Sequence, residues 1–137
     1  MNYLLDTNAC IAILNGRPAV VRFRFQDALS ARSGVFISSI VAFELWYGVG
    51  KSLQVERNAL RVASLLASSI DVLDFDGEDA RVAGLQRVAL EKVGKPIGAY
   101  DLLIAAQALR RSWTLVTANV FEFARIQGLT WQDWSKE

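Results

Sequence analysis

The sequence predicts an α/β fold of three layers (α/β/α), in which helices cover both faces of a central five-stranded parallel sheet. Five short apolar runs recur along the chain, and segments with helical apolar spacing separate them. Strands that alternate with helices in this way form parallel sheets covered on both faces. A chain of 137 residues, 53% of them hydrophobic, can bury the core that such a fold needs, so we expect a single domain over residues 1–137.

The composition narrows the chemistry available to the chain. The sequence has no histidine, which excludes His-dependent nucleophile systems and His-ligated zinc. Its one cysteine, Cys10, excludes an internal disulfide and a cysteine-rich zinc site. The net charge of +1 neither indicates nor excludes a nucleic-acid ligand, because the 11 arginines could share one face. An enzyme built from this chain would depend on carboxylates, lysine, tyrosine, a cofactor, or a metal held by oxygen atoms.

The sequence contains no candidate for a membrane helix or a signal peptide. No apolar run approaches the roughly eighteen residues that a membrane helix requires. The N-terminus lacks a basic region followed by a long apolar one. We therefore expect a cytoplasmic protein without a membrane partner.

The first strand and helix follow from local signals. An apolar run predicts a strand over residues 2–5, and apolar residues spaced three and four apart predict a helix over residues 7–15. A glycine and a proline just beyond this segment end the helix. We expect Thr7 and Asn8 to hold the start of the helix, because both residue types are preferred N-caps.

The later elements are predicted in the same way. The segment 40–49 is apolar almost all round, so we expect a buried helix there. The helix over residues 55–67 places Arg57 and Arg61 on its outer face. In full, we predict strands over residues 2–5, 35–38, 70–75, 114–117 and 129–131, and helices over residues 7–15, 19–31, 40–49, 55–67, 76–93, 99–109 and 120–125.

Most acidic residues are expected to face solvent, but the positions of two of them predict burial. We expect Asp76, Glu78 and Asp79 to be solvated charges at the start of a helix. Glu44 and Asp101, in contrast, lie on predicted helices that are otherwise apolar. An ionised acid is rarely buried unless it is paired or binds a metal. For either residue alone, a structural ion pair explains the burial as well as a functional site does.

A third acid, Asp6, makes a functional site the better explanation. Asp6 follows the first strand, Glu44 lies in the helix after the second, and Asp101 lies in the helix before the fourth. If the first, second and fourth strands are neighbours, these acids meet Asn119, which follows the fourth strand, at one edge of the sheet. No basic residue falls on the buried faces around them. We therefore assign Asp6 to this site rather than to the helix cap.

The predicted cofactor of the acid site is Mg²⁺ or Mn²⁺. Neighbouring acids raise each other's pKa, and a divalent cation removes that conflict. Both ions prefer carboxylate oxygens and retain waters. A cation in such a site polarises a phosphoryl oxygen, lowers the pKa of a bound water and stabilises the leaving oxygen. The acid site is therefore suited to hydrolysis of phosphodiester bonds, a reaction that needs no histidine.

Four sequence elements resemble those of PIN-domain nucleases, in the same order along nearly the whole chain. Asp6-Thr7-Asn8 after an N-terminal strand resembles the opening of that family. Residues 38–48 resemble its S-x-x-x-x-x-E-L-x-x-G element, and residues 98–106 its D-x-x-I-A-A helix. Residues 115–123 resemble its L-V-T-x-[ND]-x-x-x-F element. Within the family, the size and the Glu-Leu-x-x-Gly element are most similar to VapC-type toxins of toxin–antitoxin pairs, including the FitB-like branch.

The resemblance implies a five-stranded parallel sheet, a homodimer, and Mg²⁺- or Mn²⁺-dependent endoribonuclease activity on RNA. It also implies a toxin–antitoxin hetero-oligomer, in which a small antitoxin covers the site with an inserted segment. Such a complex would bind operator DNA only through the antitoxin.

The resemblance also implies roles for particular residues. Asp6, Glu44 and Asp101 match the acidic metal-binding positions of the family. Asn119 matches a fourth position that is Asp in many members, so a second metal would be held more weakly here. Thr117 matches a frequent helper hydroxyl. Thr7, in the family's opening element, is expected to support the site.

The sequence does not determine which residues contact RNA. Five basic residues lie in or beside predicted loops, although isolated surface charges are usually only solvated, and two of them could complement a helix C-terminus. Three aromatic residues could stack on bases, although such residues more often pack in a core or a dimer interface. These candidates are Arg17, Lys51, Lys95, Arg110, Arg111, Trp46, Tyr47 and Trp113.

Two other functions remain open beside the endoribonuclease. Asn119, as a neutral residue in an acidic position, would suit a weakly catalytic partner in a DNA-binding, transcription-autoregulating complex. Phosphoryl transfer of the haloacid-dehalogenase type also begins with a strand followed by Asp. That chemistry requires a second acid two residues later, where this chain has Asn8, and a motif lysine that is missing.

Overall fold

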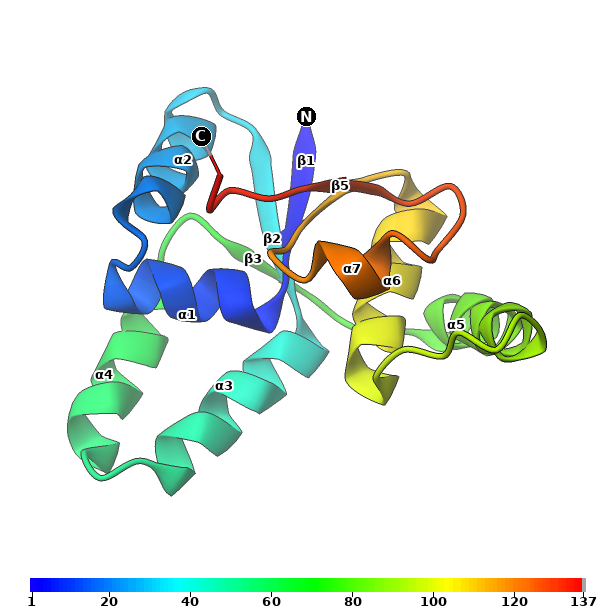
Figure 1. Ribbon diagram of the computed structural model, residues 1–137. Coiled ribbons are helices and arrows are strands. Elements are labelled where there is room, and N and C mark those ends of the chain that lie inside the picture. Colours follow the sequence, from blue (N-terminus) through cyan, green and yellow to red (C-terminus); the bar gives the residue numbers. More distant parts are fainter. Residues whose placement is uncertain (137) are drawn as a thin grey trace.

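The computed structural model describes residues 1–136, which form a parallel sheet with helices on both faces (Figure 1). The five strands are ordered β3-β2-β1-β4-β5, and every pairing is parallel. The strands are β1 (Asn2–Leu5), β2 (Gly34–Ser38), β3 (Asp71–Leu73), β4 (Thr114–Val116) and β5 (Thr130–Gln132). The helices are α1 (Thr7–Asn15), α2 (Ala19–Ser30), α3 (Ser39–Lys51), α4 (Val55–Leu66), α5 (Gly77–Lys92), α6 (Ala99–Arg111) and α7 (Val120–Phe123).

The predicted fold class is confirmed, and each predicted element is present. The bounds of β1 and α1 agree with the prediction, while β3 and α7 are shorter than predicted. The prediction of a single domain over residues 1–137 includes Glu137, which lies outside the described residues. Within residues 1–136, no helix is both long and apolar enough to cross a membrane.

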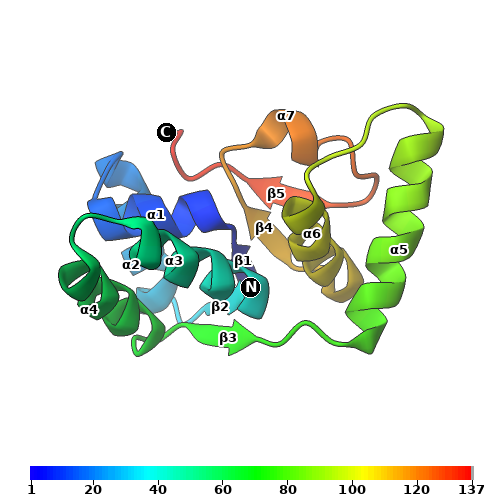
Figure 2. The ribbon, with the colours of Figure 1, turned by 90° about the horizontal axis from the view of Figure 1, so that it is seen from below.

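The layers follow from right-handed crossovers between parallel strands. From β1 the chain moves outward through β2 to β3, and α1 to α4 lie on one side of the sheet (Figure 1). It then returns to β4 and continues to β5, with α5 to α7 on the other side. Figure 2 shows α6 between the sheet and α5. The chain leaves β1 and β4 in opposite directions, so a topological switch point lies between the C-terminal ends of these two strands, where ligands bind in open α/β folds.

The strands that flank the switch point are buried in the hydrophobic core. Leu4 and Leu5 of β1, Ile37 of β2 and Leu115 of β4 are fully buried. Cys10 of α1 is fully buried among them, and its burial raises the pKa of the thiol. A thiol in such surroundings is an inert core group. The ends of β1, β2 and β4 are thus fixed in position by packing and strand pairing.

The prediction that α3 is buried all round is wrong. Val41, Leu45 and Val49 face the core, but Phe43, Trp46 and Tyr47 are exposed. The helix packs against α1, α4 and the end of β2, and it also contacts β3 and α6, where the rings of Phe43 and Tyr100 lie edge to face with centroids 5.6 Å apart. An apolar sequence without a polar stripe does not distinguish a buried helix from one that keeps an apolar face uncovered in the monomer.

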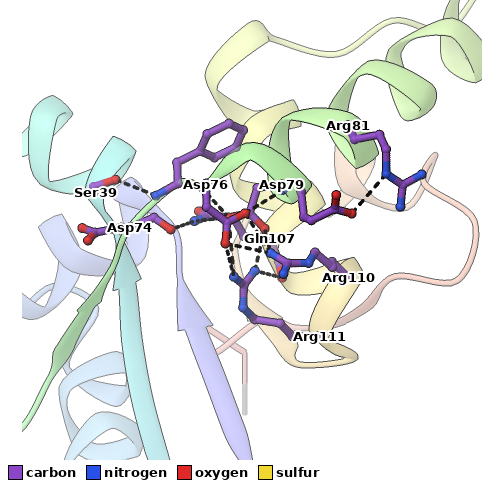
Figure 3. Close-up of polar contacts among 10 residues, drawn as sticks. Ser39, Asp74, Asp76, Asp79, Arg81, Gln107, Arg110 and Arg111 are labelled. Atoms are coloured by element: carbon purple, nitrogen blue, oxygen red, sulfur yellow. Dashed lines mark hydrogen bonds and ion pairs between the residues drawn. The ribbon is translucent and has the colours of Figure 1, made fainter.

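The prediction that Asp79 is a solvated charge is also wrong. Asp79 belongs to a capping box with Asp76 at the start of α5, and its side chain is fully buried. Its Oδ1 accepts hydrogen bonds from Arg110 and Arg111 of α6, each at 2.8 Å (Figure 3). Gln107 Nε2 donates to Asp79 Oδ2 at 3.3 Å. These contacts fasten the start of α5 to the end of α6, so Asp79 has a structural explanation.

Candidate active site

Asp6 lies at the switch point between β1 and β4. Its backbone N–H donates to the carbonyl of Val116 at 3.0 Å, which fixes it beside the end of β4. Asp6 is 3% exposed, and its side chain accepts a hydrogen bond from the Ala9 N–H at 2.8 Å. Asp6 is therefore the N-cap of α1 as well as a carboxylate of the switch point.

The expectation that Thr7 and Asn8 cap α1 is wrong for this reason. The capping position is the extended residue before the first helical turn, and Asp6 holds that conformation, with φ −79° and ψ 176°. Thr7 and Asn8 are already helical. The side chain of Thr7 is thereby left free for another contact.

That contact is with Glu44, on the neighbouring helix α3. Thr7 Oγ1 donates a hydrogen bond to Glu44 Oε1 at 2.7 Å. Glu44 is partly buried, at the edge of α3 that faces α1. A hydroxyl that donates to a carboxylate restricts its rotation and leaves its second oxygen available. The structure thus gives Thr7 a supporting contact on one acid of the site.

Asp101 lies in the first turn of α6 and is partly buried. Burial is the largest cause that raises the pKa of Asp101, and the negative charge of Asp6 is the next. Glu122 and Glu44 raise it further, and the pKa reaches about 6. These effects show that the predicted acids share one neighbourhood, because a carboxylate raises the pKa of another only at short range.

The pKa of Asp6 is raised as well. Burial is the largest cause, and hydrogen bonds from Thr117 and the Ala9 N–H oppose it. The charges of Glu44 and Asp133 add to the rise. Two buried or half-buried aspartates at the switch point are therefore held in surroundings that disfavour their charged forms.

Glu122, which follows the turn after β4, lies near the acids although its sequence position did not single it out. Thr117 is buried, and its Oγ1 accepts a hydrogen bond from the Asn119 N–H at 2.9 Å. The amide of Asn119 donates to Glu122 Oε2 at 3.1 Å. Glu122, on α7, also raises the pKa of Asp101. Its only sequence signal is a position three residues after Asn119, which places both on one side of a short helix.

The acids of this cluster have no cationic partner in the described chain. Within residues 1–136, the ion pairs involve other acids, and none includes Asp6, Glu44 or Asp101. The same residues contain no group of three acidic or cysteine side chains already arranged to hold a metal ion. The donors are nonetheless all oxygen atoms with uncompensated charge. They fit Mg²⁺ or Mn²⁺, which bind through one or two carboxylates and retain several waters.

Several of the candidate RNA-contact residues have other partners. Arg110 and Arg111 are bound to Asp76 and Asp79, as described above. Trp113 stacks on Phe36, with ring centroids 4.3 Å apart. Lys51 lies over the Tyr47 ring, with its Nζ 5.1 Å from the ring centroid. Within residues 1–136, Arg17, Lys95 and Trp46 have no such partner, and they remain candidates for contact with RNA.

Comparisons with known proteins agree with this fold and site. The family model for the PIN domain matches residues 3–129, so the chain belongs to the PIN-domain family. It is 42% identical over 135 residues to the tRNA(fMet)-specific endonuclease VapC of Shigella flexneri, a match that covers 98% of this chain and 99% of that protein. It is 38% identical to Ribonuclease VapC2 of Rickettsia felis, over 99% of this chain and 100% of that protein. Identity at this level over the full length places the chain with the VapC group of the family.

Solved structures extend the comparison. In the crystal structure of VapBC2 from Rickettsia felis bound to a DNA fragment from their promoter, one chain superposes with a TM-score of 0.89 and 38% identity. That match covers 98% of this chain and 99% of the other. FitAcB from Neisseria gonorrhoeae matches with a TM-score of 0.79 and 27% identity, over 96% of this chain and 97% of the other.

Proposed function

We propose that this chain is the toxin of a type II toxin–antitoxin pair and that it hydrolyses phosphodiester bonds of RNA in the cytoplasm, as a Mg²⁺- or Mn²⁺-dependent endoribonuclease. The observation that carries the proposal is the uncompensated group of acids at the switch point. Asp6, Glu44, Asp101 and Glu122 share one neighbourhood without an arginine or lysine paired to it in the described chain. The relatives named as VapC ribonucleases support the choice of RNA as substrate.

Asp6 and Asp101 are the proposed metal-binding residues, with Glu44 as a third ligand or as the group that orients the attacking water. A bound divalent cation supplies charge stabilisation of the phosphoryl oxygens and a water of lowered pKa. Asp6 is suited to this task because the Ala9 N–H holds its Oδ1 in place. Asp101 is suited to it because, after burial, the negative charges of Asp6, Glu122 and Glu44 raise its pKa, and a cation would balance those charges.

The other residues of the site position these acids and the substrate. Thr7 holds Glu44 through its hydroxyl. Thr117 donates to Asp6 and accepts from the backbone of Asn119, so it couples the ends of β1 and β4. We propose that Asn119 positions substrate or water and that Glu122, bound to the Asn119 amide, supplies the fourth negative charge of the site.

The proposed partners are a small antitoxin and a second copy of the chain. The VapBC2 and FitAcB structures support the antitoxin, since both names denote a complex rather than a single protein. The promoter fragment in the former supports contact with operator DNA, which we assign to the antitoxin. The exposed apolar face of α3 is a candidate for the surface of a homodimer.

The alternative of a weakly catalytic partner rested on Asn119 as the neutral fourth residue. Glu122 weakens that argument, because it places a carboxylate within hydrogen-bond distance of the Asn119 amide. The site therefore has four acids although the fourth family position is neutral. We retain the endoribonuclease as the proposed function.

The test is cleavage-site mapping across total cellular RNA, with the purified chain freed from any antitoxin. The wild type should cut RNA at defined sites with Mg²⁺ or Mn²⁺ and not in EDTA. Asp6→Asn and Asp101→Asn should each lower the cleavage rate by about 10²-fold or more, because each removes several kcal/mol of charge stabilisation at the metal. Asp27→Asn, an exposed acid on α2, is the matched control and should cleave as the wild type does. Full activity in EDTA, or in both site variants, would contradict the proposal.

A further inference from the structure

Three arginines line one polar hollow beside the C-terminal end of α1. The hollow has a volume of about 550 Å³, and Arg17, Arg57 and Arg61 line it together with Leu14 and Asn15. Arg57 and Arg61 are one turn apart on α4, and Arg17 follows α1. Like charges at this spacing on a helix repel each other, and a third guanidinium adds to the repulsion. Stability of the fold alone does not account for this concentration of positive charge.

Arg61 is the member of this arginine hollow with a structural task. It donates hydrogen bonds to the carbonyl of Leu14, to Asn15 Oδ1 at 3.1 Å and to Asn58 Oδ1 at 3.3 Å. A cation at this place complements the C-terminal end of α1, where carbonyl groups lack partners within the helix. Arg61 is therefore anchored, and its charge is fixed at the wall of the hollow.

Arg57 and Arg17 have no comparable task. Arg57 is exposed and donates only to Gln54 Oε1, at 3.0 Å. For Arg17, the described chain shows no side-chain hydrogen bond, and its side chain is exposed. Across residues 1–136, no carboxylate is paired with any arginine of the hollow. Two guanidinium groups with unused donors thus face one space beside a third.

The arginine hollow adjoins a groove that reaches Glu44, one acid of the site. A groove of about 220 Å³ runs between α1, α3 and α4, and Glu44 lines it. Leu14, Asn15 and Arg61 line both this groove and the arginine hollow. A molecule that reaches the acids past Glu44 can therefore extend along the groove to the three arginines. The groove itself is lined mainly by apolar side chains, which suit the faces of nucleobases.

We propose that the arginine hollow binds a backbone phosphate of the RNA substrate, away from the phosphate that is cleaved. The inference rests on the proposed ribonuclease function and deepens it. The acid site repels a polyanion, so affinity for RNA has to come from cations nearby. Guanidinium groups match the geometry of phosphate oxygens with paired donors. Arg110 and Arg111, which are consecutive on α6, do not serve this purpose, because Asp76 and Asp79 already neutralise their charges.

An acidic segment of a protein partner would satisfy the same arginines. The observations favour RNA, because RNA brings a phosphate at every nucleotide to both ends of the groove, whereas a peptide needs a carboxylate at one defined position. The experiment below decides between the two ligands.

The test measures RNA binding without cleavage. A fluorescein-labelled single-stranded RNA of mixed sequence, about 12 nucleotides long, is titrated with the full chain in EDTA, and anisotropy gives the Kd at several salt concentrations. The variants are Arg17→Gln, Arg57→Gln and the double variant; Arg61 is left intact because it anchors α1. Arg87→Gln is the charge-matched control for the single variants, and Arg81→Gln with Arg87→Gln is the control for the double variant. Both residues are exposed on α5, on the other side of the sheet from α4 (Figure 1).

The double variant should bind this RNA about 10-fold more weakly, and its plot of log affinity against log salt should lose about 0.7 in slope for each phosphate contact removed. Arg87→Gln, alone or with Arg81→Gln, should match the wild type. An unchanged Kd and slope in the double variant would overturn the inference. A fluorescein-labelled poly-glutamate peptide, titrated in parallel, represents the acidic protein segment. Unchanged RNA binding with weaker peptide binding in the double variant would overturn the inference and would assign the hollow to an acidic protein partner. Cleavage is scored separately, so that a chain that binds RNA through these arginines but never cuts it contradicts the proposed function alone.

Discussion

Asp6 and Asp79 are both buried aspartates at the start of a helix, with exposed fractions of 3% and 0%, yet their surroundings are opposite. Asp79 accepts hydrogen bonds from Arg110 and Arg111. Burial raises the pKa of Asp79, but these bonds outweigh it and lower the pKa to about 2. Asp6 has no cation paired to it in residues 1–136, and its pKa is raised. Burial of an acid therefore does not distinguish a structural residue from a candidate site residue; the two aspartates differ in whether their charge is compensated.

The largest effect on stability is expected at Asp79. Asp79→Ala leaves two arginines near the end of α6 without their buried partner, so the free energy of unfolding should fall by about 3–5 kcal/mol. Urea denaturation followed by circular dichroism measures it. Glu78→Ala removes an adjacent acid whose ion pair is exposed, and it should cost less than about 1 kcal/mol. Equal losses in both variants would show that the buried network does not hold α5 to α6.

Wild type and Asp79→Ala should also differ in how the free energy of unfolding changes at acid pH. The pKa of Asp79 falls from 3.8 to about 2 in the folded chain, so its contribution to stability is complete above pH 4 and is lost as the pH falls toward 2. Wild type and Asp79→Ala should therefore differ strongly in unfolding free energy at pH 6 and converge near pH 2. A difference that persists unchanged at pH 2 would contradict this explanation.

Thr7 tests whether the acids of the site must be oriented. Thr7→Val keeps the shape of the side chain and removes the hydroxyl that donates to Glu44. Loss of a hydrogen bond to a metal ligand typically lowers metal affinity or enzyme activity by 10- to 100-fold. We therefore expect the rate of RNA cleavage to fall by about 10-fold. Thr7→Ser keeps the hydroxyl and should retain the activity. If Thr7→Val cleaves at the wild-type rate, the contact has no role in catalysis.

Asp101 should show the opposite pH dependence to Asp79. Its pKa rises from 3.8 to about 6 in the folded chain, so the folded state holds more protons between these values, and wild-type stability falls as the pH rises through that window. Asp101→Asn removes the charge. It should raise the Tm by about 3 °C at pH 8 and leave it unchanged at pH 4. Scanning calorimetry at both pH values measures it, and a lower Tm at pH 8 would contradict the claim that this charge is uncompensated.

The smallest expected effect is at Glu122. Glu122→Gln removes one negative charge near Asp101, so the pKa of Asp101 should move back toward its ordinary value without reaching it, because burial and Asp6 still act. NMR titration of the Asp101 carboxyl carbon follows this change. No movement at all would place Glu122 outside the acid cluster.

The local elements and the three acids were predictable from the sequence because their signals are local. An apolar run that ends on Asp6, and acids on the apolar helices of Glu44 and Asp101, require no knowledge of distant partners. The parallel order of the strands then gathers them at the end of β1. Asp79 was misassigned because its partners lie 31 and 32 residues further along the chain, and no local pattern joins them. Glu122 was missed because its role depends on the turn that brings α7 toward Asp101.

The most direct test of the contrast between the two aspartates is calorimetric titration of Mn²⁺ into the wild type, Asp101→Asn and Asp79→Asn at pH 7.5. Both variants remove one negative charge, but only Asp101 belongs to the uncompensated cluster. The wild type and Asp79→Asn should bind Mn²⁺ with the same affinity, and Asp101→Asn should bind it at least about 10-fold more weakly. Equal affinity of Asp101→Asn and the wild type would contradict the account of the acid cluster as a cation site.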